Sequence, residues 1–305
     1  MEKGREDWNH GFDIFLCFNL KRNISSPTDF SPFCVNFIST ISQPWAPMKG
    51  GENLRIEILA LTDEGHGFDK MARASRLYLA FPAGQVHSES YLKSLNPSLN
   101  VSMIVEVPPV AMLPNCLVQK KVLHPFRKQV GGTILAAKLA KERGWAINVG
   151  GGFHHCSSEK GGGFCVYADI SLCIHFAFVR LNISRVMIID LDAHQGNGHE
   201  MDFSDDRRVF ILDMYNPGIY PLDFEARRYI DLGVEVKSGT ATDEYLTKLD
   251  HALEVAEKKI DPDFIVYNAG TDILDGDPLG RLKVRPTDGK QAICGLHVCC
   301  YGIAT

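Results

Sequence analysis

Apolar residues in the second part of the chain recur with two different spacings. Four short runs are apolar almost throughout, as is typical of buried strands: 145–150, 184–192, 208–216 and 263–272. Longer stretches between them repeat apolar residues at helical spacing: 131–144, 167–181 and 241–260, the last with Thr242 as its expected N-cap. Strands that alternate with helices in this way predict an α/β fold in which helices cover both faces of a central parallel sheet.

The two ends of the chain lack this regularity. Residues 25–33 and 42–53 are rich in Ser, Pro and Gly and are typical of loops, and only 54–62 has the pattern of a strand. Residues 286–305 show no clear periodicity. We therefore expect an α/β domain at 86–285, preceded by a segment 1–85 of unknown role and followed by a divergent tail.

Composition narrows the classes of function. The 305 residues carry a formal net charge of -5 without a long Lys or Arg run, whereas a nucleic-acid surface needs clustered basic residues. Nine cysteines with no CxxC pair, and no basic leader, predict reduced thiols in the nucleus or cytoplasm. The early apolar run 12–20 is too short to span a bilayer. We expect neither nucleic acid nor a membrane as a direct partner.

Polar side chains follow three of the predicted strands at the point where each strand ends. They are His154 and His155 after the first strand, Asp190, Asp192 and His194 at the second, and Asp272 at the last. Each of these residues alone could be a helix cap or a loop residue. Together they matter more, because parallel sheets bind ligands at the carboxyl ends of their strands.

The spacing at the second strand favours a metal site. Asp192 and His194 lie two positions apart, so in an extended segment their side chains leave the same face. With Asp272 they would make an open site of two carboxylates and one imidazole. Zinc suits this set, although ligand type alone leaves iron(II) and cobalt open. Asp190 faces the other way and is expected to orient His154.

Three stretches resemble one enzyme family. They are GGGFHHCSSEKGGGFCVYADI, IIDLDAHQGNGHE and YNAGTDILDGDPLGRL, and they resemble the zinc-dependent histone deacetylases. Within this family the three stretches resemble the class IV branch, the type related to histone deacetylase eleven. The stretch VHSESYLKSL is similar to the plant members. The resemblance covers about 86–285, and it implies an arginase-like three-layer fold with a central parallel sheet. It also implies hydrolysis of acyl-lysine amides in histones or other proteins, in the nucleus or cytoplasm.

The resemblance assigns a role to each matched residue. The implied ligands of one zinc ion are Asp192, His194 and Asp272. The implied catalytic histidines are His154 and His155, supported by Asp190 and Asn197. The implied walls of an acyl-lysine tunnel are Phe153, Gly163, Phe164 and Tyr215. The family also suggests a potassium ion held by backbone carbonyls around 190–194.

Two departures from the family pattern change the expectation. Asn197 stands where most deacetylases carry an Asp, so His155 is expected to stay neutral and available as a base. No Gly-Gly-Tyr segment, whose tyrosine stabilises the oxyanion in the family, occurs before Thr305. We therefore expect weak activity, a fold that is incomplete at its C-terminal end and an open sheet edge.

Two other interpretations remain open. The first is a binuclear manganese ureohydrolase, which shares the DAH and TDILDGDP stretches but needs a further Asp where this chain has Gly196. The second is not enzymatic: a folded remnant that binds acyl-lysine tails or partner proteins without turnover. Measured turnover would separate it from a hydrolase.

Overall fold

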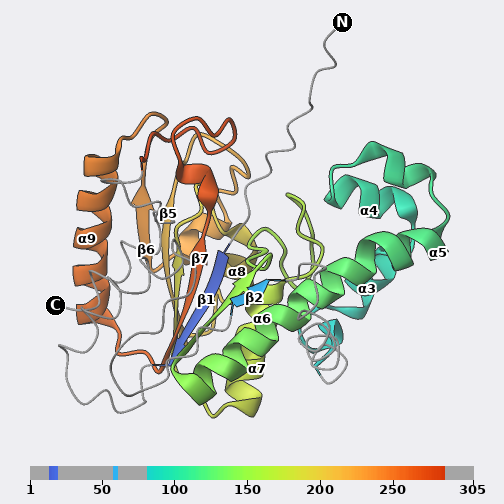
Figure 1. The fold of residues 1–305 in the computed structure, drawn as a ribbon, viewed down its shortest axis with the longest axis horizontal. Helices are drawn as coiled ribbons and strands as arrows, with labels where there is room; N and C mark the ends of the chain where they lie inside the picture. Colours follow the sequence, from blue (N-terminus) through green and yellow to red (C-terminus); the bar gives the residue numbers. More distant parts are fainter. Residues whose placement is uncertain (1–13, 20–57, 61–80, 286–305) are drawn as a thin grey trace, which may run out of the picture.

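The computed structural model describes residues 14–19, 58–60 and 81–285, and these build one sheet with the strand order β2-β3-β1-β7-β4-β5-β6 (Figure 1). The strands are β1 Ile14–Asn19, β2 Ile58–Ala60, β3 Trp145–Val149, β4 Val186–Asp190, β5 Val209–Tyr215, β6 Leu232–Glu235 and β7 Phe264–Ala269. The tail 286–305 and most of the segment 1–85 lie outside the described residues.

Four neighbouring strands, β7, β4, β5 and β6, are parallel, as predicted. Every residue of β4, β5 and β7 is buried, because helices cover both faces of the sheet. β4 lies between β5 and β7, with Asp190 opposite Asp213 on one side and Asn268 on the other. The ends of these strands therefore meet at one edge.

One strand departs from the all-parallel prediction. β1 lies antiparallel between β3 and β7, so that Ile14 faces both Val149 and Ala269. The sequence did not reveal this pairing, because an apolar run shows that a segment suits a strand but not which direction it takes. Segment 1–85, for which the sequence analysis found no role, thus contributes β1 and β2.

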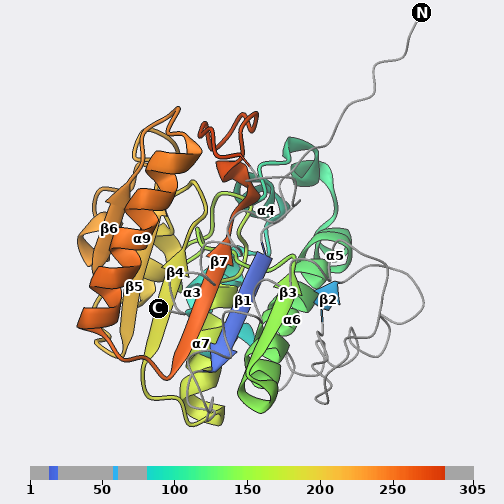
Figure 2. The same cartoon turned by 60° about the vertical axis from the view of Figure 1, so that its left-hand side comes forward.

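Helices form a layer on each face of the sheet (Figure 2). α6, His124–Arg143, and α7, Asp169–Arg180, pack on one face, with Val186 and Ile188 of β4. α9, Thr242–Lys259, packs on the opposite face, with Met187 and Ile189. This alternation gives the three layers that the sequence predicted.

The remaining helices are short. They are α3 Glu89–Ser94, α4 Ser98–Ile104, α5 Asn115–Val118 and α8 Asn197–Asp202, with single turns at Ala83–Gln85, Pro108–Met112, Gln119–Leu123, Ala226–Tyr229 and Thr271–Ile273. In the described ranges, no helix combines the length and apolarity needed to cross a bilayer. The expected N-cap was misplaced: Thr242 is the first residue of α9, and its hydroxyl accepts from Arg285 N instead.

Candidate metal and catalytic site

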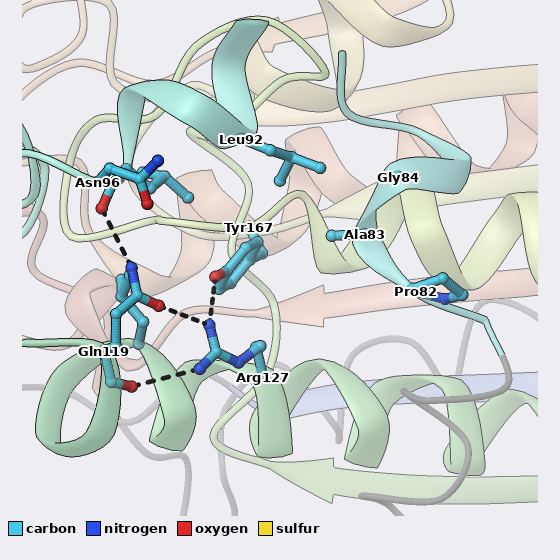
Figure 3. Close-up of a pocket in the computed structure, with 10 residues that line it drawn as sticks. Pro82, Ala83, Gly84, Leu92, Asn96, Gln119, Arg127 and Tyr167 are labelled. Atoms are coloured by element: carbon cyan, nitrogen blue, oxygen red, sulfur yellow. Dashed lines mark hydrogen bonds between the residues drawn. The ribbon is translucent and has the colours of Figure 1, made fainter. Parts of the chain in front are cut away.

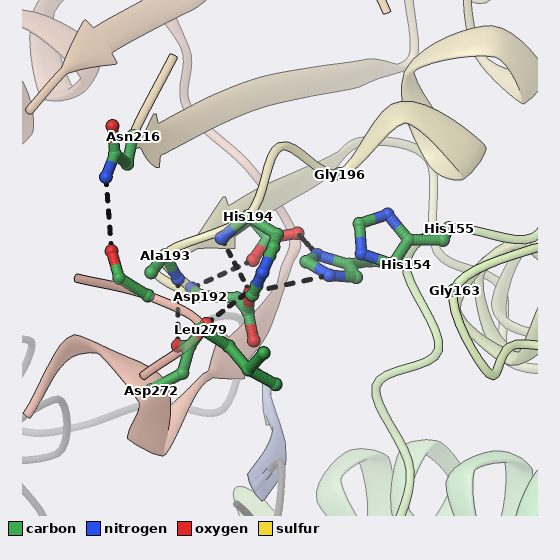
Figure 4. A network of polar contacts seen from close by, with 12 residues as sticks. His154, His155, Gly163, Asp192, Ala193, His194, Gly196, Asn216, Asp272 and Leu279 are labelled. Atoms are coloured by element: carbon green, nitrogen blue, oxygen red, sulfur yellow. Dashed lines mark hydrogen bonds and ion pairs between the residues drawn. The ribbon is translucent and has the colours of Figure 1, made fainter. Parts of the chain in front are cut away.

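Three side chains that follow β4 and β7 converge at the edge of the sheet (Figure 4). His194 Nδ1 lies 3.0 Å from Asp192 Oδ1 and 2.7 Å from Asp272 Oδ2. One ligand atom from each of these residues lies within 4.8 Å of the other two. They meet because β4 and β7 are parallel neighbours whose carboxyl ends lie side by side. The sequence-predicted ligand set is thus brought together.

The electrostatics of this cluster favour a cation. Burial lowers the pKa of His194, but hydrogen bonds and charge from Asp192 and Asp272 outweigh it and raise the pKa to about 10. Burial and the charge of Asp192 raise the pKa of Asp272 to about 6. Burial opposes ionisation of Asp192 too, yet the charges of His154 and His194 hold its pKa below the usual value. A metal ion would supply the positive charge that a proton on His194 otherwise provides.

His154 is held in place by a hydrogen bond to Asp190. His154 Nδ1 lies 2.9 Å from Asp190 Oδ2, and its Nε2 lies 3.5 Å from Asp192 Oδ1. Burial raises the pKa of Asp190, but His154 and His199 outweigh this and lower it below the usual value. Asp190 is therefore an acceptor, and His154 donates from Nδ1 and presents Nε2 to the metal cluster.

His155 is paired differently. Its Nδ1 lies 2.9 Å from Asn197 Oδ1, and its ring centroid lies 5.8 Å from that of His194. Burial, followed by the charge of His154, lowers the pKa of His155 well below its usual value, although Asn197 opposes this. The direction agrees with the sequence-based expectation of a neutral His155.

The loop that carries both histidines is anchored by a buried carboxylate that the sequence analysis did not single out. Asp169, the first residue of α7, accepts from Gly152 N at 2.9 Å and from Phe153 N at 2.7 Å. The Thr133 hydroxyl donates to the same side chain at 2.7 Å. The only signal was an acid at a helix start, which usually indicates a cap.

The predicted tunnel residues differ in their exposure and in the residues that they contact. Gly163 has φ of +51°, and a Cβ there would lie 2.5 Å from His155 Cδ2. Phe164, next in the chain, is 46% exposed. The Phe153 ring packs against Phe126, with centroids 5.4 Å apart.

The structure does not bring Tyr215 to the histidines. Its side chain is buried at the end of β5, with its hydroxyl 3.5 Å from Glu235 and Arg227 over its ring. Tyr220, five residues later, is 45% exposed, and its ring centroid lies 4.8 Å from that of His155. The reason is that a strand residue is fixed in the core, whereas the loop after β5 reaches the histidines.

His199 is another residue that the sequence analysis missed, and it contacts the same carboxylate as His154. His199 of α8 is 1% exposed, and its Nε2 lies 2.8 Å from Asp190 Oδ2, the oxygen that His154 also contacts. This approach requires Gly196, because a Cβ there would lie 2.1 Å from His199 Nε2. The motif HQGNGHE thus places His194 in the metal cluster and His199 against Asp190, the carboxylate that holds His154.

A separate pocket of about 250 Å³ opens beside α3 and α6 (Figure 3). It is lined by none of the metal or histidine residues. The guanidinium of Arg127 inside it donates to the Tyr167 hydroxyl at 3.1 Å and to the backbone oxygen of Gln119 at 3.3 Å. We therefore place the chemistry at the strand ends and not in this pocket.

Comparison with known proteins decides the family. Residues 60–300 match the histone deacetylase domain. The chain belongs to this family. Histone deacetylase 2 of Arabidopsis thaliana is 74% identical over 201 residues, which cover 66% of this chain and 52% of that protein. Histone deacetylase 8 of Xenopus tropicalis is 27% identical over 176 residues, covering 54% of this chain and 47% of that protein. The chain thus spans about half the length of these relatives.

Solved structures share the histone deacetylase fold. An HDAC homolog crystallised with SAHA matches with a TM-score of 0.52 at 20% identity, over 66% of this chain and 57% of that one. The HDA15 HD domain matches with a TM-score of 0.53 at 17% identity, over 77% of this chain and 80% of that one. At these identities the likeness establishes the fold of the chain and not its substrate.

Proposed function

We propose that this histone deacetylase chain hydrolyses acyl-lysine amides with the help of one zinc ion, as a member of the class IV branch. The observation that carries the proposal is the convergence of Asp192, His194 and Asp272 beside His154 and His155. The family match supports deacylation as the reaction. Acylated histones or other acyl-lysine proteins are the proposed substrates, in the nucleus or cytoplasm.

The ligand set fits the proposed metal. Two carboxylate oxygens and one imidazole nitrogen leave a fourth position open, as in hydrolytic zinc sites. A bound zinc ion would polarise the amide carbonyl and lower the pKa of a water molecule. These three residues supply all the protein ligands that such a site needs. The potassium ion suggested by the family remains a prediction.

The histidines divide the proton chemistry between them. His155, with a lowered pKa, is neutral near pH 7 and has a free ring nitrogen to accept a proton from water and pass it to the leaving lysine amine. His154, fixed by Asp190, keeps its Nε2 directed at the metal cluster. Gly163 and Tyr220 border His155, where they would enclose the lysine stem.

The alternative of a binuclear ureohydrolase is disfavoured by Gly196. A side chain at this position would collide with His199 Nε2 at 2.1 Å and Asp190 Oδ2 at 2.6 Å, so a metal-bridging Asp has no room here. Binding of acyl-lysine without turnover remains the second candidate. A rate measurement would separate this binding function from hydrolysis and would show whether the activity is weak.

The test is an assay of acetyl and myristoyl release from lysine peptides by the purified chain. His155→Ala should lower the rate by roughly 10²–10⁴-fold, the usual contribution of a general base. His251→Ala, which removes an exposed histidine on α9, is the matched control and should keep the wild-type rate. Peptide binding without any release by the wild-type chain would replace the hydrolase with the binding function.

A further inference from the structure

Asn197 contacts a second polar group besides His155. Its Oδ1 lies 2.9 Å from His155 Nδ1, and its Nδ2 lies 3.2 Å from Asp223 Oδ2. A carboxylate only accepts hydrogen bonds, so the amide must direct its NH₂ group to Asp223. The orientation of Asn197, which is ambiguous for an isolated amide, is therefore fixed by its acidic neighbour.

The fixed amide determines which nitrogen of His155 carries hydrogen. Because Asn197 Oδ1 can only accept, His155 must donate from Nδ1. The neutral ring then has its lone pair on Nε2, at the opposite edge. A flipped amide would present NH₂ to Nδ1 and favour the other tautomer, in which Nε2 already holds a hydrogen and cannot act as a base.

Asp223 is itself held in place. Its Oδ1 accepts from Ala226 N at 3.0 Å, which leaves Oδ2 for Asn197. Its backbone oxygen accepts from Gln195 Nε2 at 3.1 Å, so the loop after β5 is tied to the segment that carries the metal cluster. The half-buried carboxylate thus has one oxygen for its own turn and one for the histidine support.

We propose that Asp223 is a positioning residue that fixes the Asn197 amide and thereby the Nδ1–H tautomer of His155. The proposal rests on the deacylase function for its kinetic consequence, but its structural content does not. In this chain Asn197, held by Asp223, accepts the Nδ1–H hydrogen bond that a carboxylate beside the histidine would accept. When His155 takes up a proton at Nε2, its Nδ1–H bond to Asn197 stays in place.

Three variants test the proposal in the full chain. Asp223→Asn keeps an oxygen for Ala226 N but lets the Asn197 amide rotate, and we expect kcat to fall roughly tenfold with little change in KM, within the range for supporting residues of metal sites. The double variant Asn197→Asp with Asp223→Asn should regain activity, because a carboxylate at 197 accepts from His155 in any orientation. In the Asn197→Asp background, Asp223→Asn should therefore cause no loss.

The ¹⁵N spectrum of the His155 ring gives the deciding readout, since it reports the tautomer without turnover. We expect hydrogen on Nδ1 in the wild type and in the double variant, and a shift toward the Nε2–H form in Asp223→Asn. An unchanged tautomer in Asp223→Asn would overturn the proposal, whatever the kinetics. A shifted tautomer in a chain that releases no acyl group would instead uphold the proposal and reject the deacylase function.

Discussion

His199 Nε2 and Asp190 Oδ2 lie 2.8 Å apart, and both side chains are buried. The same oxygen accepts from His154 Nδ1 at 2.9 Å, while Oδ1 accepts from Asp192 N and Asn268 Nδ2. Asp190 is therefore a fully bonded carboxylate, and two histidines share one of its oxygens. This relationship makes His199 part of the support of His154.

Replacing His199 should weaken that support. His199→Leu removes a donor to a buried carboxylate and should lower the free energy of unfolding by about 1–3 kcal/mol. His199→Gln offers an amide donor of similar reach and should recover part of the loss. Urea unfolding of the metal-free proteins is the measurement. Equal destabilisation by Leu and Gln would show that packing, and not the bond to Asp190, is what His199 contributes.

Gly163 should be intolerant of even one methyl group. In Gly163→Ala the left-handed backbone costs about 1–2 kcal/mol, and the new Cβ would also press on His155 Cδ2 at 2.5 Å. Gly239→Ala is the matched control, because φ is +87° there and nothing lies within 4 Å of the added Cβ. We expect both variants to lose thermal stability and only Gly163→Ala to lose activity; equal activities would exclude a role of Gly163 in placing His155.

The buried carboxyl of Asp213 should make stability depend on pH. Burial, the charge of Asp190 and the neighbouring Glu200 raise the pKa of Asp213 well above its usual value. A raised folded-state pKa stabilises the fold below the unfolded pKa of about 4, and this contribution is lost as the pH rises toward the folded-state pKa. Asp213→Asn should therefore unfold at a higher temperature than the wild type at pH 7 to 8, by a margin that shrinks toward pH 4.

A second aspartate gives a control of opposite sign. The hydrogen bond from Arg208 lowers the pKa of Asp206, so its contribution is present above the unfolded pKa and lost as the pH falls. Asp206→Asn should lower the melting temperature at pH 7 and lose this effect in acid. A melting-temperature difference for Asp213→Asn that does not change with pH would contradict the raised pKa of Asp213.

The fold was predictable where apolar runs were long and continuous. β4, β5 and β7 were found because strands buried on both faces read as uninterrupted apolar stretches. The place of β1 was not predictable, because a segment more than a hundred residues from its partners inserts between β3 and β7. Long-range pairing depends on which strand edges are open, and the local pattern does not contain that information.

The site was predictable to the extent that its residues follow those strands. Asp192, His194 and Asp272 were found because residues after parallel strands share one edge. Tyr220, His199 and Asp223 were missed since each comes from a loop or short helix whose direction is set by tertiary contacts. His199, five positions after His194, was visible in the sequence. The sequence did not show that its side chain contacts Asp190 Oδ2.

The metal content of the purified chain tests the central claim most directly. Elemental analysis together with X-ray absorption should find about one zinc per chain, with oxygen and nitrogen neighbours at about 2.0–2.2 Å. Asp192→Asn and Asp272→Asn should lose the ion. Asp206→Asn should retain it, because the Asp206 side chain bonds to Arg208 and does not belong to the cluster. Zinc that remains at wild-type content in both cluster variants, or a wild-type chain that binds none when zinc is supplied, would contradict the account.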